Sequence, residues 1–308
     1  MIELRSDELW ATLDPEHGAE IVRLTALRSG SALLGSPPFV PAPARAGDLD
    51  EEAWTASYRG GWQLAAPNAG AACDVEGVRH GFHGRASVDP WSLVEHDDAH
   101  AVLSWSGHGL RLRRSIGVTG ARLTVELAWR AIAAPVPLIA VEHVCLGAAL
   151  LDPRVEIQAR ARAHELADTG GPPLPPDDAV VWPGCRLLDG GVERGGSWPF
   201  DEPRSRFIAL TGFDHGAAEI RNPDSGLAVR LDWDVAKLPA AWIWHELRGN
   251  DGIWDRRAEL LGVEPASVPH ALGLGEAVQH GQALWATRGG WDGYAMSLTV
   301  TDTRARRR

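Results

Sequence analysis

Two histidines lie three residues apart in a stretch that is rich in glycine and arginine. His80 and His83 belong to residues 79–85, whose sequence is RHGFHGR. The glycines argue against a helix, and no nearby cysteine or second carboxylate completes a ligand set, so the spacing predicts no metal site. Imidazoles in a glycine-flanked loop are typical of binding or catalytic positions, and a purely structural role is the alternative for each.

Two further groups could transfer protons. His143 follows an apolar run at residues 136–141, which predicts a buried strand that ends near the imidazole. Glu264 lies in the segment GVEP at residues 262–265. A carboxylate is costly to bury without a partner, so Glu264 either pairs structurally or serves as a base with a shifted pKa. For His143, the alternative to an acid or base is a core histidine whose hydrogen bonds are satisfied.

Polar groups suited to holding a ligand lie upstream of the histidines. Residues 60–63 are GGWQ and residues 67–70 are PNAG. Glycines let the backbone approach a ligand, and the amides of Gln63 and Asn68 offer donors and acceptors. The alternative is a glycine-rich turn between strands. The chain also has 14 tryptophans, whose flat faces suit the C–H faces of sugars, although most should fill the core.

The elements that must position these groups are strands. Apolar and polar residues alternate at residues 123–129, 227–233 and 296–300, which predicts half-buried antiparallel strands. No regular succession of strands and helices is visible, which disfavours a doubly wound fold. We therefore predict an all-β fold, a large antiparallel β-sandwich that residues 1–308 form as a single domain.

Other segments carry weaker signals. One short helix is expected at residues 255–261. The residues at 169–178 are rich in glycine and proline and should form a surface loop rather than a hinge between domains. The basic residues at 304–308 should form a frayed tail.

Composition excludes several classes of function. The net charge of −11 argues against non-specific nucleic-acid binding, which needs a basic surface. The three cysteines, Cys73, Cys145 and Cys185, lie far apart and predict neither a zinc site nor a disulfide framework. The first residues are charged where a signal peptide is apolar, and no stretch is apolar enough to span a bilayer. We therefore expect a cytoplasmic protein without membrane partners.

The order of these short motifs resembles that of the aldose 1-epimerase (mutarotase) family. A GGWQ and PN segment comes first, then an HG loop with Trp91 eight residues after His83, then His143, and finally the G-x-E-P around Glu264. Residues 18–24 (GAEIVRL) also look like the first hairpin of the family. The resemblance therefore spans nearly the whole chain, and it implies a β-sandwich of the galactose mutarotase type.

The resemblance also implies roles for individual residues. His83 looks like the first family histidine, His143 like the second, which is the usual proton donor, and Glu264 like the usual base. His80 is a rival for the first position, because HGF at residues 80–82 resembles a form seen in sugar-phosphate mutarotases. The base should lie on one side of the sugar ring with at least one histidine across a ligand-sized gap.

Two departures from the family pattern bear on the substrate. The sequence around the second histidine is Glu142-His143-Val144, where related proteins often have His-His-Pro. Asn68 is followed by alanine where many sugar epimerases have arginine, a place that Arg59 or Arg85 could take.

The expected activity is interconversion of the α and β anomers of a hexose-like sugar by acid–base ring opening, without a cofactor or metal. The expected partner is a small sugar, and the oligomeric state stays open, a homodimer included. Two alternatives remain, a non-catalytic carbohydrate-binding protein on the same fold and a sugar-phosphate mutarotase. Candidate substrate contacts are Gln63, Asn68, His80, Arg85 and one of Trp62, Trp242 or Trp244.

Overall fold

Strands make up most of the regular structure of this protein. The computed structural model describes residues 1–43, 45–167, 178–199 and 202–303. The structure is 50% strand and 8% helix, which confirms the predicted all-β fold. Among the described residues, no helix has the length and apolar character needed to cross a bilayer.

The larger of two sheets carries the candidate site. Its described strands, in spatial order, are β1 (Ile2–Arg5), β2 (Leu9–Asp14), β3 (Glu20–Ala26), β5 (Trp62–Ala65), β13 (Val141–Leu146), β24 (Glu259–Ala266), β23 (Ala240–Leu247), β20 (Arg204–Thr211), β15 (Arg162–Glu165), β17 (Gly184–Arg186) and β18 (Val192–Arg194). The short strands β4 (Ser31–Ala32) and β16 (Val180–Val181) pair with β3 and β15. Neighbouring strands are antiparallel except β15 and β17, which are parallel.

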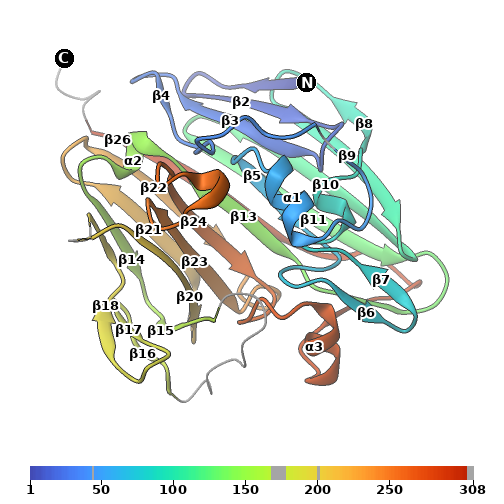
Figure 1. Cartoon of the computed structure of the whole chain (residues 1–308). Helices are drawn as coiled ribbons and strands as arrows, with labels where there is room; N and C mark the ends of the chain where they lie inside the picture. The colour runs from blue at the N-terminus through green and yellow to red at the C-terminus, as the bar shows by residue number, and fades with distance from the viewer. Residues whose placement is uncertain (44, 168–177, 200–201, 304–308) are drawn as a thin grey trace.

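The second sheet packs against the first. Its described strands, in spatial order, are β19 (Ser197–Trp198), β14 (Val155–Ala159), β21 (Gly216–Asn222), β22 (Leu227–Trp233), β26 (Asp292–Asp302), β11 (Arg122–Ala131), β10 (Leu110–Thr119), β9 (His100–Gly107) and β8 (Ser92–His96). Figure 1 shows the two sheets as layers. One continuous cluster of buried apolar side chains joins them, with residues such as Leu64 and Val144 from one sheet and Leu112 and Leu231 from the other.

Helices and small two-stranded sheets cover the ends and the outer face of the larger sheet. The helices are α1 (Glu51–Ser57), α2 (Ala148–Leu151) and α3 (Leu274–Gln279), with short 3₁₀ turns η1 (Arg85–Ser87) and η3 (Gly252–Trp254). The two-stranded sheets are the hairpin of β6 (Cys73–Val75) with β7 (Val78–His80), and the pair that β12 (Val136–Leu138) forms with the distant strand β25 (Leu284–Ala286). Figure 1 shows α1, in blue, near β5 and β13.

The alternating segments form strands where alternation predicted them. They are β11, β22 and β26, which are neighbours in the second sheet. Leu298 of β26 pairs with Leu123 on one side and with Leu231 on the other. These leucines are fully buried, so the alternation marks the face that meets the larger sheet.

Two local predictions were wrong. The expected helix at residues 255–261 is absent, because η3 ends at Trp254 and β24 begins at Glu259, where pairing with both β13 and β23 overrides local propensity. The apolar run at 136–141 is not one strand, since β12 pairs with β25 and β13 begins only at Val141. His143 is therefore inside β13 rather than at a strand end. Residues 169–177 and 304–308, a predicted loop and tail, lie outside the described residues.

Candidate active site

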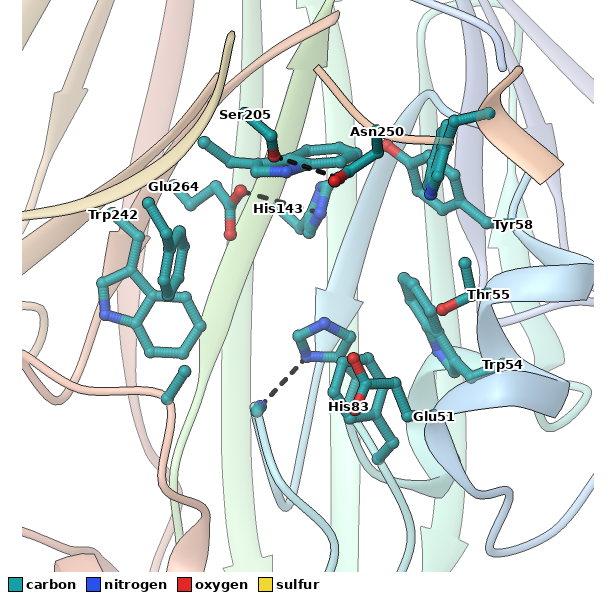
Figure 2. A pocket seen from close by; sticks show the side chains of 16 residues that line it. Glu51, Trp54, Thr55, Tyr58, His83, His143, Ser205, Trp242, Asn250 and Glu264 are labelled. Atoms are coloured by element: carbon teal, nitrogen blue, oxygen red, sulfur yellow. Dashed lines mark hydrogen bonds and ion pairs between the residues drawn. The ribbon is translucent and has the colours of Figure 1, made fainter. Parts of the chain in front are cut away.

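A cavity of about 250 Å³ opens on the outer face of the larger sheet. Its floor comes from β13, β23 and β24, and its walls come from α1, β20 and the turns that carry Gly70 and His83. Figure 2 shows His143 and Glu264 at the back of the cavity, His83 below them and the α1 side chains to one side. The cavity is smaller than the roughly 300–1,000 Å³ typical of drug-sized ligands, which favours a small ligand.

His143 and Glu264 are brought together by the pairing of β13 with β24. The register pairs Val141 with Ala266 and Val144 with Val263, so the two functional side chains face each other across the same strand pair. His143 Nε2 lies 3.6 Å from Glu264 Oε1. No ligand-sized gap therefore separates His143 from Glu264, and His83, which lines the same cavity, is the histidine that could lie across such a gap.

A glycine makes room for the glutamate. A Cβ at position 262 would lie 2.3 Å from Glu264 Oε1, a distance that real Cβ atoms do not reach. The glycine of the G-x-E-P segment therefore leaves the space that the carboxylate occupies, and a side chain there would force the Glu264 carboxylate to move. No turn is involved, because residue 262 lies inside β24.

Burial shapes the protonation of this pair. The exposed fraction is 1% for Glu264 and 6% for His143. Burial raises the pKa of Glu264 well above its usual range and lowers the pKa of His143 to about 4. Both effects favour neutral side chains. No partner among the described residues hydrogen-bonds Glu264 Oε1 or His143 Nδ1.

His83 approaches from another wall of the cavity. Its Nδ1 accepts a hydrogen bond of 3.1 Å from the Gly70 N–H, so in the neutral ring the proton is on Nε2. Burial lowers the pKa of His83 well below its usual value, and the nearby His143 acts in the same direction. The two imidazole centroids are 6.0 Å apart. His83 can thus offer one N–H donor to a ligand.

Aromatic side chains form much of the remaining lining. Trp244 lines the cavity as predicted, and so does Trp242. The centroid of Tyr58 lies 5.6 Å from that of His143, and Trp54 lies 4.5 Å from His83. Such rings supply flat apolar surface and exclude water.

Sequence reasoning missed α1, which carries Trp54 and Tyr58 to the cavity. Its N-cap is Asp50, whose side chain accepts a 2.8 Å hydrogen bond from the Ala53 N–H. Acidic residues follow the cap in the first turn. An Asp before two glutamates is a helix-start signal that could have revealed this element.

Three predicted sugar contacts are buried elsewhere. Trp62 is a core residue that donates a 2.6 Å hydrogen bond to Glu142, a place that does not fit sugar contact. Gln63 pairs with His143 across the strands but does not line the cavity. Asn68 is fully buried, donates to the carbonyls of Ala71 and Gly81, and accepts from the backbone N–H at 274, so it holds the turn around Gly70.

His80 and Arg85 also lie outside the cavity lining. His80 is buried against His108, with 3.3 Å between their Nδ1 atoms. Arg85 makes a 3.1 Å ion pair with Asp89. Arg59, the other candidate for a missing arginine, is held by Asp14 and Glu20.

The cavity thus contains no cationic side chain among the described residues that line it. In the same part of the chain, no cluster of three or more histidine, cysteine or acidic side chains is arranged to hold a metal ion.

Comparisons with known proteins agree on the fold. A galactose mutarotase-like protein from Lactobacillus casei matches with a TM-score of 0.66 at 13% identity, covering 98% of this chain and 100% of that one. A "putative aldose 1-epimerase" from Escherichia coli K12 matches with a TM-score of 0.67 at 18% identity, covering 97% and 98%. A galactose mutarotase related enzyme from Lactobacillus acidophilus matches with a TM-score of 0.64 at 11% identity, covering 98% and 97%.

Comparisons with protein-family models and with curated proteins gave no match. Sequence identities this low support a conclusion about the fold and about nothing further. The order of motifs along the sequence and these structural matches lead to the same architecture, so this chain has the galactose mutarotase-like β-sandwich fold.

Proposed function

We propose that this protein is an aldose 1-epimerase acting on a neutral aldose. The observation that carries the proposal is the contact between His143 and Glu264, 3.6 Å apart and buried at the back of a small aromatic cavity. A protein that only binds sugar has no need for an acid and a base side by side. Buried ionisable groups with shifted pKa values in a cleft are typical of catalytic sites.

The spacing of the two groups suits the chemistry. Ring opening removes a proton from the anomeric hydroxyl O1 and delivers one to the ring oxygen O5. Both oxygens are bonded to C1, so the groups that serve them must also lie close together. A contacting pair on one side of the anomeric centre therefore fits better than two groups separated by the whole ring.

The pair exchanges one proton in each direction. In the neutral form favoured by burial, His143 accepts the O1 proton while protonated Glu264 donates to O5. The C1–O5 bond breaks, its electron pair stays on O5, and C1=O1 forms. The aldehyde rotates about C1–C2. On closure on its other face, the O5–H proton returns to Glu264, O5 attacks C1, and His143 gives its proton back to O1. The ionic form, with Glu264 as base and His143 as donor as the family resemblance implies, has the same number of protons.

His83 completes the site as a hydrogen-bond donor. Its Nε2–H can bind O1 or a neighbouring hydroxyl, because Nδ1 is occupied by Gly70. As O1 becomes a carbonyl oxygen, a positioned N–H donor stabilises its developing charge.

The absence of lysine and arginine among the described lining residues favours a neutral sugar over a sugar phosphate. A phosphate site usually contains several cationic side chains. Glu51, which also lines the cavity, would repel a phosphate instead.

The test is anomer exchange measured by NMR on a panel of neutral and phosphorylated aldoses. We expect exchange above the spontaneous rate for at least one neutral aldose and none for its 6-phosphate. If a neutral aldose binds without any acceleration of exchange, the protein is a carbohydrate-binding protein. If only phosphorylated sugars exchange, the neutral-substrate assignment is wrong.

A further inference from the structure

A second polar group lies at the cavity rim, apart from the acid–base pair. Ser205 on β20 and Asn250, just beyond β23, both line the cavity. The Asn250 Nδ2 donates a 3.0 Å hydrogen bond to Ser205 Oγ and a second hydrogen bond to Glu246 Oε2. Figure 2 shows Ser205 and Asn250 on the opposite side of the cavity from His83.

Glu246 is the buried member of this polar group. Along β23, the neighbours Ile243 and Leu247 belong to the core between the sheets, whereas Trp242 and Trp244 line the cavity. Side chains alternate along a strand, so Glu246 lies on the cavity face with the two tryptophans. Its exposed fraction is nevertheless 0%, because the turn at 249–250 covers it.

Four donors surround the Glu246 carboxylate. They are the backbone N–H groups of Gly249 and Asn250, the Asn250 side-chain amide and the Ser205 hydroxyl. Burial raises the pKa of Glu246, and these hydrogen bonds oppose that rise because they stabilise the charged form. A carboxylate only accepts hydrogen bonds, so the NH₂ end of the Asn250 side chain must face it.

The orientation of Asn250 determines what the rim offers to a ligand. Both hydrogens of Nδ2 are used, by Ser205 and Glu246. The hydrogen of the Ser205 hydroxyl is also used, by Glu246. What these two side chains have left is acceptor capacity, on Asn250 Oδ1 and on the second lone pair of Ser205 Oγ. This part of the rim can therefore bind only a group that donates a hydrogen bond.

We propose that Asn250, oriented by Glu246 and Ser205, accepts a hydrogen bond from one sugar hydroxyl and selects aldoses in which that hydroxyl is free. The proposal rests on the proposed function for the identity of the ligand. A deoxy, O-methyl or phosphate group at that carbon cannot donate the bond. Glu246 is a positioning residue, since it acts through the Asn250 amide and lies beneath it.

The experiment compares wild type with Asn250→Ala on the aldose that is turned over fastest and on its 2-, 3-, 4- and 6-deoxy derivatives. The readouts are kcat/KM from anomer exchange and Kd from tryptophan fluorescence. With wild type, the ratio of kcat/KM for the parent sugar to kcat/KM for one deoxy sugar should be about three to ten, which is the effect of one net hydrogen bond at an accessible site. With Asn250→Ala that ratio should fall to near one, while the ratios for the other deoxy sugars stay unchanged.

Glu246→Gln tests the positioning role. It keeps the shape of the buried side chain but can donate to the Asn250 amide, so the NH₂ end of the amide is no longer held towards residue 246 and the amide can turn over. We expect the same selective loss of discrimination with Asn250 intact. Asp251→Asn is the control, because Asp251 is exposed, pairs with Arg256 and does not line the cavity.

The outcomes separate this proposal from the proposed function. If no aldose is turned over but one binds with a deoxy-sensitive Kd that Asn250→Ala abolishes, the epimerase assignment fails and the rim assignment stands. If Asn250→Ala lowers kcat/KM equally for every sugar, Asn250 has only a structural role. If no aldose binds, or if the discrimination survives in Asn250→Ala, the rim assignment is overturned.

Discussion

The substitution Glu264→Gln isolates the proton-transfer role of the carboxylate. The side chain is almost fully buried, and its Oε1 has no hydrogen-bond partner among the described residues. Glutamine keeps the shape and can still hydrogen-bond a sugar, but it neither donates an acidic proton nor accepts one. The fold should tolerate the change, because it removes an ionisable group from an apolar environment and creates no cavity.

The expected loss is about two to four orders of magnitude in kcat. Each factor of ten corresponds to about 1.36 kcal/mol, so the loss is roughly 2.7–5.4 kcal/mol of transition-state stabilisation. Binding should change much less, since the lost interaction is made mainly in the transition state. His143 is the only other member of the 3.6 Å pair, so His143→Asn should cost a similar amount. The double variant should cost little more than either alone, because groups that act as a unit are not additive.

The assay is anomer exchange by NMR on the best neutral aldose, with Kd from tryptophan fluorescence. Glu259→Gln is the matched control, since Glu259 is on the same strand but pairs with Arg248 on the surface, and it should exchange like wild type. Wild-type exchange by Glu264→Gln would refute the catalytic role. Fully additive losses in the double variant would refute a shared proton.

Three further outcomes are expected. The profile of kcat/KM against pH should be bell-shaped. It should fall near pH 4, where neutral His143 gains a proton, and again at higher pH, where Glu264, whose pKa is raised by burial, loses its proton. A pH-independent profile would contradict the catalytic role of the pair. Arg114→Met should lower the free energy of unfolding by about 3–5 kcal/mol in urea titrations, because it leaves Glu142 buried and charged without its 2.7 Å partner, whereas an unchanged midpoint would contradict this. Finally, burial lowers the pKa of His17 to about 4, so the unfolded chain binds more protons between pH 6.5 and 4. The free energy of unfolding should therefore decrease as the pH is lowered from 6.5 to 4. In calorimetry at pH 7 and pH 5, His17→Gln should show a smaller decrease than wild type.

The sequence by itself determined the strands and the class of fold. Alternation of apolar and polar residues is a local property of a strand that is buried on one face, so β11, β22 and β26 could be located without knowledge of their partners. The order of short motifs likewise pointed to His83, His143 and Glu264, which the structure places around one cavity. Roles for these residues remain predictions.

Only the tertiary structure decided which side chains meet. Trp62 and Trp244 both lie on strands of the larger sheet, yet one faces the core and the other the cavity, because the neighbouring strands and layers determine which face is covered. The contact of His143 with Glu264 depends on the register of β13 against β24, and the rim depends on Glu246 holding Asn250. The contacts of His143 with Glu264 and of Asn250 with Ser205 join residues far apart in sequence, so no local pattern encodes them, and packing and strand register bring them together.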